Sequence, residues 1–286
     1  MILLIAAMKP EADPLMRFYR LKKDMTVTAF PVFRNDSVAI VISGTGKLRS
    51  AAAAAMLLTM YDARKDDTLL VNIGFAGSRT RSASPGQLFI IQKITDADTG
   101  RDYYPDVLPE SGLPRAELTT YPRPVFEPPE DSSKEDSGDR VLLLDMEAAG
   151  IMEASARFLE TQQVLILKIV SDLLSPDGLT ADVLKGYMDD RVSDLAKIIE
   201  TVYEENGRYR KELFAEETAK LLDVCQMHKF TKDMTRQLER ILRKVCLSGG
   251  DVMPVLDEAR TFTVFTKTEG KKVFEHIGCQ LEKRIV

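Results

Sequence analysis

Residues 38–61 read VAIVISGTGKLRSAAAAAMLLTMY: an apolar run of strand length, a turn with two glycines and an alanine-rich helical pattern. A second helical pattern, Met146–Leu159, also follows a strand-like run. Strand-length apolar runs recur at Ile2–Ala7, Val38–Ile42, Leu69–Ile73, Leu88–Ile91, Val141–Leu144 and Val164–Val170. Short buried strands that alternate with helices are typical of an α/β layered domain with a mostly parallel sheet. We predict such a domain over residues 1–204.

Composition narrows the class of protein. The chain has 286 residues, of which 44% are apolar and 29% charged, so it is neither disordered, collagen-like nor a coiled coil as a whole. Its net charge of −5 gives no electrostatic reason to expect nucleic acid or an anionic membrane as a partner. The apolar start, Met1–Met8, lacks a basic leader and is far shorter than the roughly 20 residues of a membrane span. Three widely spaced cysteines favour a reducing cytoplasm.

Two regions depart from the α/β pattern. Proline, glycine, serine and acidic residues dominate 99–140, most of all in 128–136, which predicts a long surface excursion. Within it, Leu118–Phe126 is predicted as an extended strand, and its prolines suit a sheet edge. Helical patterns then take over at Tyr209–Met227, Lys232–Cys246, Val252–Ala259 and Lys271–Glu282. We therefore predict a separate all-α module over residues 205–286.

Four short motifs follow predicted strands, and the carboxyl ends of parallel strands are where α/β sheets bind ligands. They are Ser43-Gly44-Thr45-Gly46-Lys47, Asn72-Ile73-Gly74-Phe75-Ala76-Gly77, Asp145-Met146-Glu147 and Ser171-Asp172. The first lacks P-loop spacing, but its amides at a helix start suit an anion or a polar ligand atom. Each motif also has a purely structural explanation, as a turn, an acidic first helical turn or an N-cap.

Carboxyl groups give these motifs a possible chemistry. Asp172 ends the most apolar strand, where partial burial would raise its pKa and suit it to donate a proton near neutrality. Glu147 stands at a strand end, where a carboxylate can bind substrate hydroxyls. Glu11 follows the first strand and by itself is unremarkable.

In this order, Glu11, SGTGK, NIGFAG, DMEA and SD resemble the 5′-methylthioadenosine/S-adenosylhomocysteine nucleosidase family, within the nucleoside phosphorylase superfamily. The resemblance covers about residues 1–175 with one gap and does not reach the helical module. It implies a three-layer α/β/α sandwich with a mixed, twisted central sheet, cleavage of an N-ribosidic bond and a homodimer. No cofactor is expected.

The resemblance also implies roles for five residues. Glu11 matches the acid that activates the attacking water. Glu147 matches the acid that binds the ribose 2′ and 3′ hydroxyls, and Met146 the residue that packs on the sugar. Asp172 matches the general acid that protonates purine N7, with Ser171 supporting it.

Other positions bear on the substrate. Thr45 stands where an apolar residue usually contacts the 5′-alkylthio group, and Phe75, beside Gly74, replaces a small polar residue. Val125 or Phe126 could lie beside the base, although this region is shortened relative to the family. The base and the 5′ substituent therefore stay open. Lys168 stands where an arginine is usual.

Two alternatives to a nucleosidase remain. In phosphorylases of this superfamily an arginine commonly replaces Asn72 and a hydroxyl residue replaces Phe75, which favours water as the nucleophile here. Arg79 and Arg81 nevertheless keep phosphorolysis open. The other alternative is a catalytically degenerate nucleoside-binding module that recruits a partner through its helical tail.

Residues 101–104 could form a lid over the sugar or an exposed loop.

The helical module contains both histidines and all three cysteines. Cys225 and His228, like His276 and Cys279, have the i, i+3 spacing that places two ligands on one helix face, so a zinc site is conceivable. Packing is the commoner role of buried cysteines. We favour a module that binds a protein partner or supports a dimer, without metal.

Overall fold

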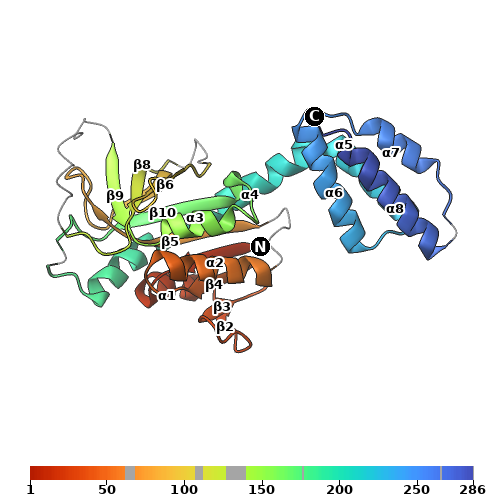
Figure 1. The fold of residues 1–286 in the computed structure, drawn as a ribbon. Coiled ribbons are helices and arrows are strands. Elements are labelled where there is room, and N and C mark those ends of the chain that lie inside the picture. Colours follow the sequence, from red (N-terminus) through yellow and green to blue (C-terminus); the bar gives the residue numbers. More distant parts are fainter. Residues whose placement is uncertain (62–67, 107–111, 127–139, 176, 265, 286) are drawn as a thin grey trace. The chain divides into compact units, whose positions relative to one another are not determined.

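The computed structural model describes residues 1–61, 68–106, 112–126, 140–175, 177–264 and 266–285. The chain divides into two compact units, Met1–Asn206 and Gly207–Val286 (Figure 1). The sequence placed the boundary at 204/205, where helix patterns replace strand patterns.

The first unit is built on one mixed sheet. At its centre, β1 (Ile2–Ala6) pairs in parallel with β4 (Val38–Ile42) on one side and β5 (Leu69–Ser78) on the other. β5 pairs in parallel with β10 (Val164–Val170). The sheet extends beyond β4 through two short antiparallel strands, β3 (Val32–Arg34) and β2 (Lys22–Lys23).

Five strands of this sheet close into a ring. From β10 the pairing continues through β6 (Leu88–Asp96), β8 (Arg115–Thr120) and β9 (Val141–Asp145), and β9 returns to β5. β7 (Asp102–Tyr103) adds a short antiparallel pairing to β6. The ring brings the ends of β5, β8, β9 and β10 to one region.

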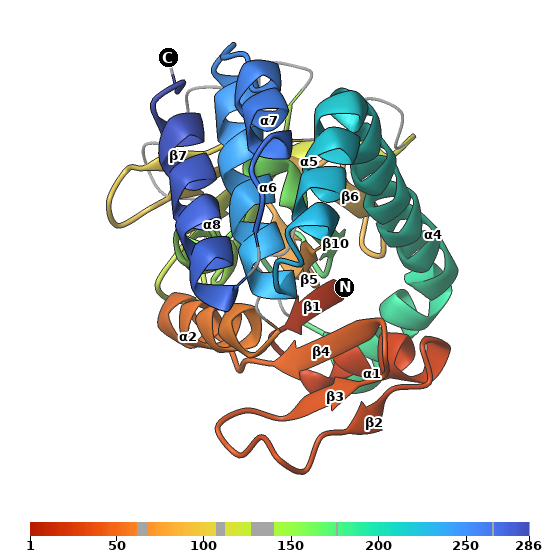
Figure 2. The same cartoon turned by 90° about the vertical axis from the view of Figure 1, so that its right-hand side faces the viewer.

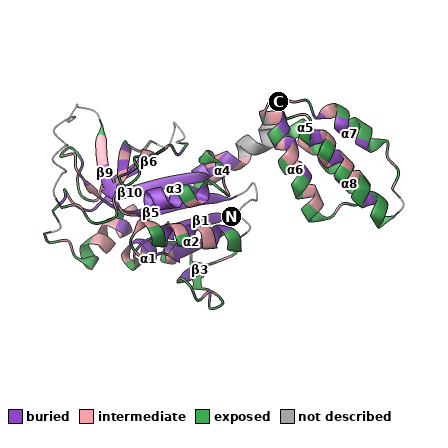
Figure 3. Cartoon of the chain, viewed as in Figure 1, coloured by how far each residue is buried: buried purple, intermediate pink, exposed green. Residues whose placement is uncertain are grey.

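Helices cover both faces of the sheet. α2 (Lys47–Met60) and α3 (Ala148–Ser155) bury their apolar sides against one face. α1 (Lys9–Phe18) and α4 (Ala181–Leu213) pack on the other. The strands between them are almost wholly buried (Figure 3). This is the predicted three-layer α/β/α fold, and the prediction is confirmed.

α2 and α3 approach closely because Gly150 has no side chain. A β-carbon at Gly150 would lie 2.2 Å from the carbonyl oxygen of Lys47. The start of α2 is thereby held against α3 close to Glu147, the N-cap of α3.

The second unit is an all-α bundle with a core of its own (Figure 2). Its helices are α5 (Ala215–Met227), α6 (Lys232–Leu247), α7 (Met253–Arg260) and α8 (Lys267–Glu282). α6 packs between α5 and α8, and α7 also contacts both. None of the helices among the described residues is long and apolar enough to cross a membrane.

The elements differ from the predictions in several places, and α1, β2, β3 and β7 had no predicted counterpart. The helix predicted over Tyr209–Met227 is divided at Phe214 between the end of α4 and α5. The strand expected at Leu118–Phe126 is β8, which ends at Thr120, before the prolines, and lies inside the sheet between β6 and β9. α4 was not predicted, and it continues as one helix past the expected domain boundary. The second helical pattern shortens to Ala148–Ser155. The acidic run 128–136 lies outside the described residues.

Candidate active site

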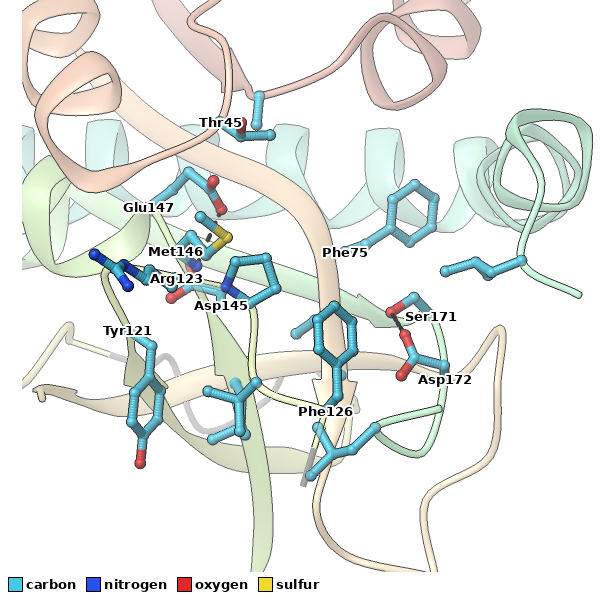
Figure 4. Close-up of a pocket in the computed structure, with 18 of the residues that line it drawn as sticks. Thr45, Phe75, Tyr121, Arg123, Phe126, Asp145, Met146, Glu147, Ser171 and Asp172 are labelled. Atoms are coloured by element: carbon cyan, nitrogen blue, oxygen red, sulfur yellow. Dashed lines mark hydrogen bonds between the residues drawn. The ribbon is translucent and has the colours of Figure 1, made fainter. Parts of the chain in front are cut away.

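A cavity of about 230 Å³ opens at the carboxyl ends of β1, β4, β5, β8, β9 and β10 (Figure 4). Its described walls include nine of the ten residues that the sequence singled out: Glu11, Thr45, Phe75, Val125, Phe126, Met146, Glu147, Ser171 and Asp172. The tenth, Gly74, lies behind Glu11.

Glu11 is placed by the turn from β1 into α1. It is the third residue of α1, and its carboxylate bends back to accept a hydrogen bond from the Met8 amide (2.8 Å) and another from the Phe75 amide (3.0 Å). Its side chain is 2% exposed. Burial raises the pKa of Glu11 to about 7, against the opposing effects of Lys168 and the two amides. A group with this pKa can accept a proton near neutral pH.

Gly74 makes room for that carboxylate. A β-carbon at this position would lie 3.0 Å from Glu11 Oε1 and 3.5 Å from Lys168 Nζ. The glycine therefore leaves room for both side chains over the backbone of β5.

Glu147 is held by the loop between β4 and α2. Its Oε1 accepts a hydrogen bond from the Gly46 amide (2.9 Å), and its Oε2 one from the Met146 amide (3.3 Å). Gly46 has φ = 109°, a conformation that favours glycine. The SGTGK loop thus holds an anion, as its amides predicted, but this anion is the protein's own carboxylate. Burial, followed by the nearby Asp145, raises the pKa of Glu147.

Lys47 of the same loop does not face the cavity. Its ammonium pairs with Asp96 (2.6 Å) and Asp98 (2.5 Å). The lysine therefore anchors the start of α2 to the end of β6.

Asp145 and Lys168 form a buried ion pair behind Glu147, with 2.9 Å between Oδ2 and Nζ. Asp145 also accepts hydrogen bonds from the Thr120 hydroxyl (2.6 Å) and the Ala148 amide (2.9 Å). Burial alone would lower the pKa of Lys168, but Asp145, Glu147 and Glu11 hold it above its usual value.

Ser171 and Asp172 form another part of the cavity wall. The Ser171 hydroxyl donates to Asp172 Oδ2 (2.5 Å), and the Asp172 carbonyl accepts from the Ser78 amide (2.8 Å). Asp172 is half-buried. Figure 4 shows Asp172 and Glu147 at different ends of the space, with Phe126 beside Asp172. Phe126 is 58% exposed, so it stands at the mouth of the cavity.

Several residues considered for function lie elsewhere. Neither Arg79 nor Arg81 is among the described lining residues. Asn72 is buried in β5 and donates to the Ile5 carbonyl (3.2 Å). Arg101 and Tyr103 bind Glu153 of α3 rather than lying over the cavity.

No zinc site forms among the described residues. They contain no group of three or more His, Cys, Asp or Glu side chains that could hold a metal ion. Cys225 is buried and Cys279 exposed, whereas His228 Nε2 lies 2.8 Å from the Ala259 carbonyl.

Sequence reasoning missed part of the cavity wall. Arg123, Tyr121, Leu174 and Leu179 line it without any sequence signal that pointed to them. Lys168, which is not among the described lining residues, did give a sequence signal: a cation in the middle of an otherwise aliphatic strand, VLILKIV, needs a buried partner.

A scan against protein-family models and a search of curated protein sequences find no match. Solved structures do match. The 5′-methylthioadenosine/S-adenosylhomocysteine nucleosidase of Neisseria meningitidis, in complex with methylthio-immucillin-A, has a TM-score of 0.57 and 19% identity, over 70% of this chain and 98% of that one. The Arabidopsis thaliana 5′-methylthioadenosine nucleosidase has a TM-score of 0.59 and 17% identity, over 70% of this chain and 95% of that one. The Helicobacter pylori futalosine hydrolase has a TM-score of 0.55 and 13% identity, over 71% of this chain and 97% of that one. At these identities the likeness shows the fold, which is that of the nucleosidases.

Proposed function

We propose that this protein hydrolyses the N-ribosidic bond of a purine nucleoside or a 5′-modified adenosine and releases the free base. One observation carries the proposal: Glu11, Glu147 and Asp172, which come from three separate motifs, line a single cavity at the strand ends.

The chemistry of the reaction matches these groups. Cleavage of the C–N bond builds positive charge on the ribose and negative charge on the leaving base. Glu147 stabilises the first and binds the sugar hydroxyls, whereas Asp172 protonates the base, with its carboxyl oriented by Ser171. Glu11, whose pKa is about 7, takes a proton from the attacking water.

Charge favours water over phosphate as the nucleophile. The described lining residues include four acids, Glu11, Asp145, Glu147 and Asp172, and a single cation, Arg123. A phosphate dianion would be repelled by such a wall, whereas a neutral water would not.

The structural neighbours support the substrate class by analogy of fold. Methylthioadenosine, adenosylhomocysteine and 5′-deoxyadenosine are the substrates we favour. We further propose that the protein acts in the cytoplasm as a homodimer, and that residues 205–286 bind a protein partner or support the dimer.

The test is a nucleoside panel. Purified protein is incubated with methylthioadenosine, adenosylhomocysteine, 5′-deoxyadenosine and inosine, with and without phosphate, and free base is measured by chromatography. We expect phosphate-independent base release that falls at least 100-fold in Asp172→Asn. A strict phosphate requirement would identify a phosphorylase. Ligand binding without turnover, unchanged by Asp172→Asn, would identify a binding module.

A further inference from the structure

Lys168 is the buried charge that the proposed reaction leaves unassigned. Its side chain is 1% exposed and starts from the middle of β10. From there it reaches Asp145 at the end of β9, although these two strands are not paired with each other. The lysine therefore links two members of the strand ring across its interior.

Through Asp145, the lysine helps to hold the start of α3 in place. The two Asp145 oxygens bind Thr120 at the end of β8, the Ala148 amide in the first turn of α3, and Lys168 itself. Glu147 is the N-cap of the same helix, so the position of its carboxylate depends on this anchor.

Lys168 also lies beside Glu11. Its ammonium and Glu11 Oε1 lie 3.5 Å and 3.0 Å from the point that a β-carbon of Gly74 would occupy. Lys168 thus stands among three acids from three elements: Glu11 of α1, Asp145 of β9 and Glu147 of α3.

Loss of the lysine would leave this cluster with three acids and no compensating cation. The three carboxyls are 2%, 6% and 8% exposed, and Lys168 is the one cation that acts on all three in the described structure. A buried carboxylate without a compensating charge is strongly unfavourable. Loss of the ammonium would force the acids to take up protons or to move.

We propose that Lys168 is a positioning residue of the hydrolytic site, which fixes Asp145 behind Glu147 and keeps Glu11 ionised so that Glu11 can accept a proton from water. This inference rests on the proposed function for its reaction, but not for the link between Lys168 and Glu11.

The test compares Lys168→Met with Lys168→Arg, which keeps the charge. Protein labelled with ¹³C at the glutamate carboxyl is titrated by NMR, and the Glu11 signal is identified by its loss in Glu11→Gln. We expect the midpoint of Glu11 to rise by one pH unit or more in Lys168→Met and to stay within half a unit in Lys168→Arg. The acid limb of kcat/KM should shift in the same direction.

A double variant keeps the test possible if the single variant does not fold. If Lys168→Met alone does not fold, Lys168→Met with Asp145→Asn leaves neither partner of the ion pair uncompensated, and it is titrated instead. An unchanged Glu11 midpoint in the folded methionine variant would overturn the proposal. If the unsubstituted protein releases no base, the proposed function fails, while the titration still decides whether Lys168 controls Glu11.

Discussion

Glu11 is a buried carboxyl that receives two backbone hydrogen bonds and lies beside an ammonium group. Burial opposes its ionisation, and these neighbours favour it. Its pKa of about 7 results from this opposition, so its protonation state changes within the physiological range.

This pKa predicts how activity depends on pH. Because the base must be ionised, kcat/KM for base release should rise with pH up to about 7 and fall about tenfold per unit below it. The measurement is a kcat/KM profile from pH 5 to 9, with folding checked at each pH by circular dichroism. A profile that stays flat between pH 5 and 7 would exclude Glu11 as the base.

Gly74 gives a second prediction at this scale. In Gly74→Ala the new methyl group would press on Glu11 Oε1, at 3.0 Å, and displace the carboxylate by a few tenths of an ångström. Because catalysis depends on such positioning, we expect kcat to fall about tenfold with little change in KM. Gly186→Ala is the matched control, since a β-carbon there meets nothing within 4 Å. Equal kcat values in the two variants would contradict the role given to Gly74.

At the same scale, the sequence predicted those residues of the candidate site that belong to a motif directly after a strand. Glu147 and Asp172 end apolar runs, so their meeting at one sheet edge followed from the fold. Arg123 and Leu174 reach the cavity from loops whose paths depend on tertiary packing. The pairing of Lys168 with Asp145 depends on how β9 and β10 are placed in the ring, which no local pattern specifies.

At the scale of the elements, the contact between α2 and α3 positions a residue of the candidate site. α3 starts directly after its N-cap Glu147, and α2 starts directly after Gly46, whose amide donates a hydrogen bond to the Glu147 carboxylate. A displacement of one helix relative to the other would therefore disturb the proposed sugar-binding acid.

Gly150→Ala tests this contact. The added β-carbon would lie 2.2 Å from the Lys47 carbonyl oxygen, so the helices must move apart. We expect the free energy of unfolding to fall by about 1–3 kcal/mol, as measured by urea denaturation. Base release should also decrease. A variant as stable as Gly186→Ala would show that the contact adapts without strain.

Elements with strong apolar runs were predictable, and those with weak patterns were not. β4 and β10 have the predicted bounds because a run of five apolar residues, and a run of seven in which only Lys168 is polar, permit little else. α4 escaped prediction because its polar residues outnumber its apolar ones along 33 residues, and only a narrow side packs on the sheet. β8 was misplaced because its pattern, buried only at every second residue, gives a weak signal, and because Val125 and Phe126 extended the predicted strand beyond its true end at Thr120.

At the scale of the whole molecule, the two units have separate hydrophobic cores. One contains the sheet with α1 to α4, and the other contains α5 to α8. Proteins with more than one core often unfold in more than one step.

Matched leucine substitutions test this independence. Leu238 and Leu195 are both fully buried, the first in the α-helical core and the second in the sheet core. Each Leu→Ala change should lower the stability of its own unit by about 2–5 kcal/mol. With tyrosine fluorescence and base release followed during denaturation, Leu238→Ala should leave the midpoint for loss of activity unchanged. If it lowers that midpoint as much as Leu195→Ala does, the two units unfold together.

The closed ring of strands also bears on solubility at high protein concentration. A sheet edge with free backbone groups can recruit a strand from another molecule and start aggregation, and closure removes such edges from the five strands of the ring. At the open end of the sheet, β2 consists of two exposed lysines, Lys22 and Lys23. Lysines on an edge strand repel the same lysines of a second molecule, so Lys22 and Lys23 disfavour edge-to-edge association of two sheets.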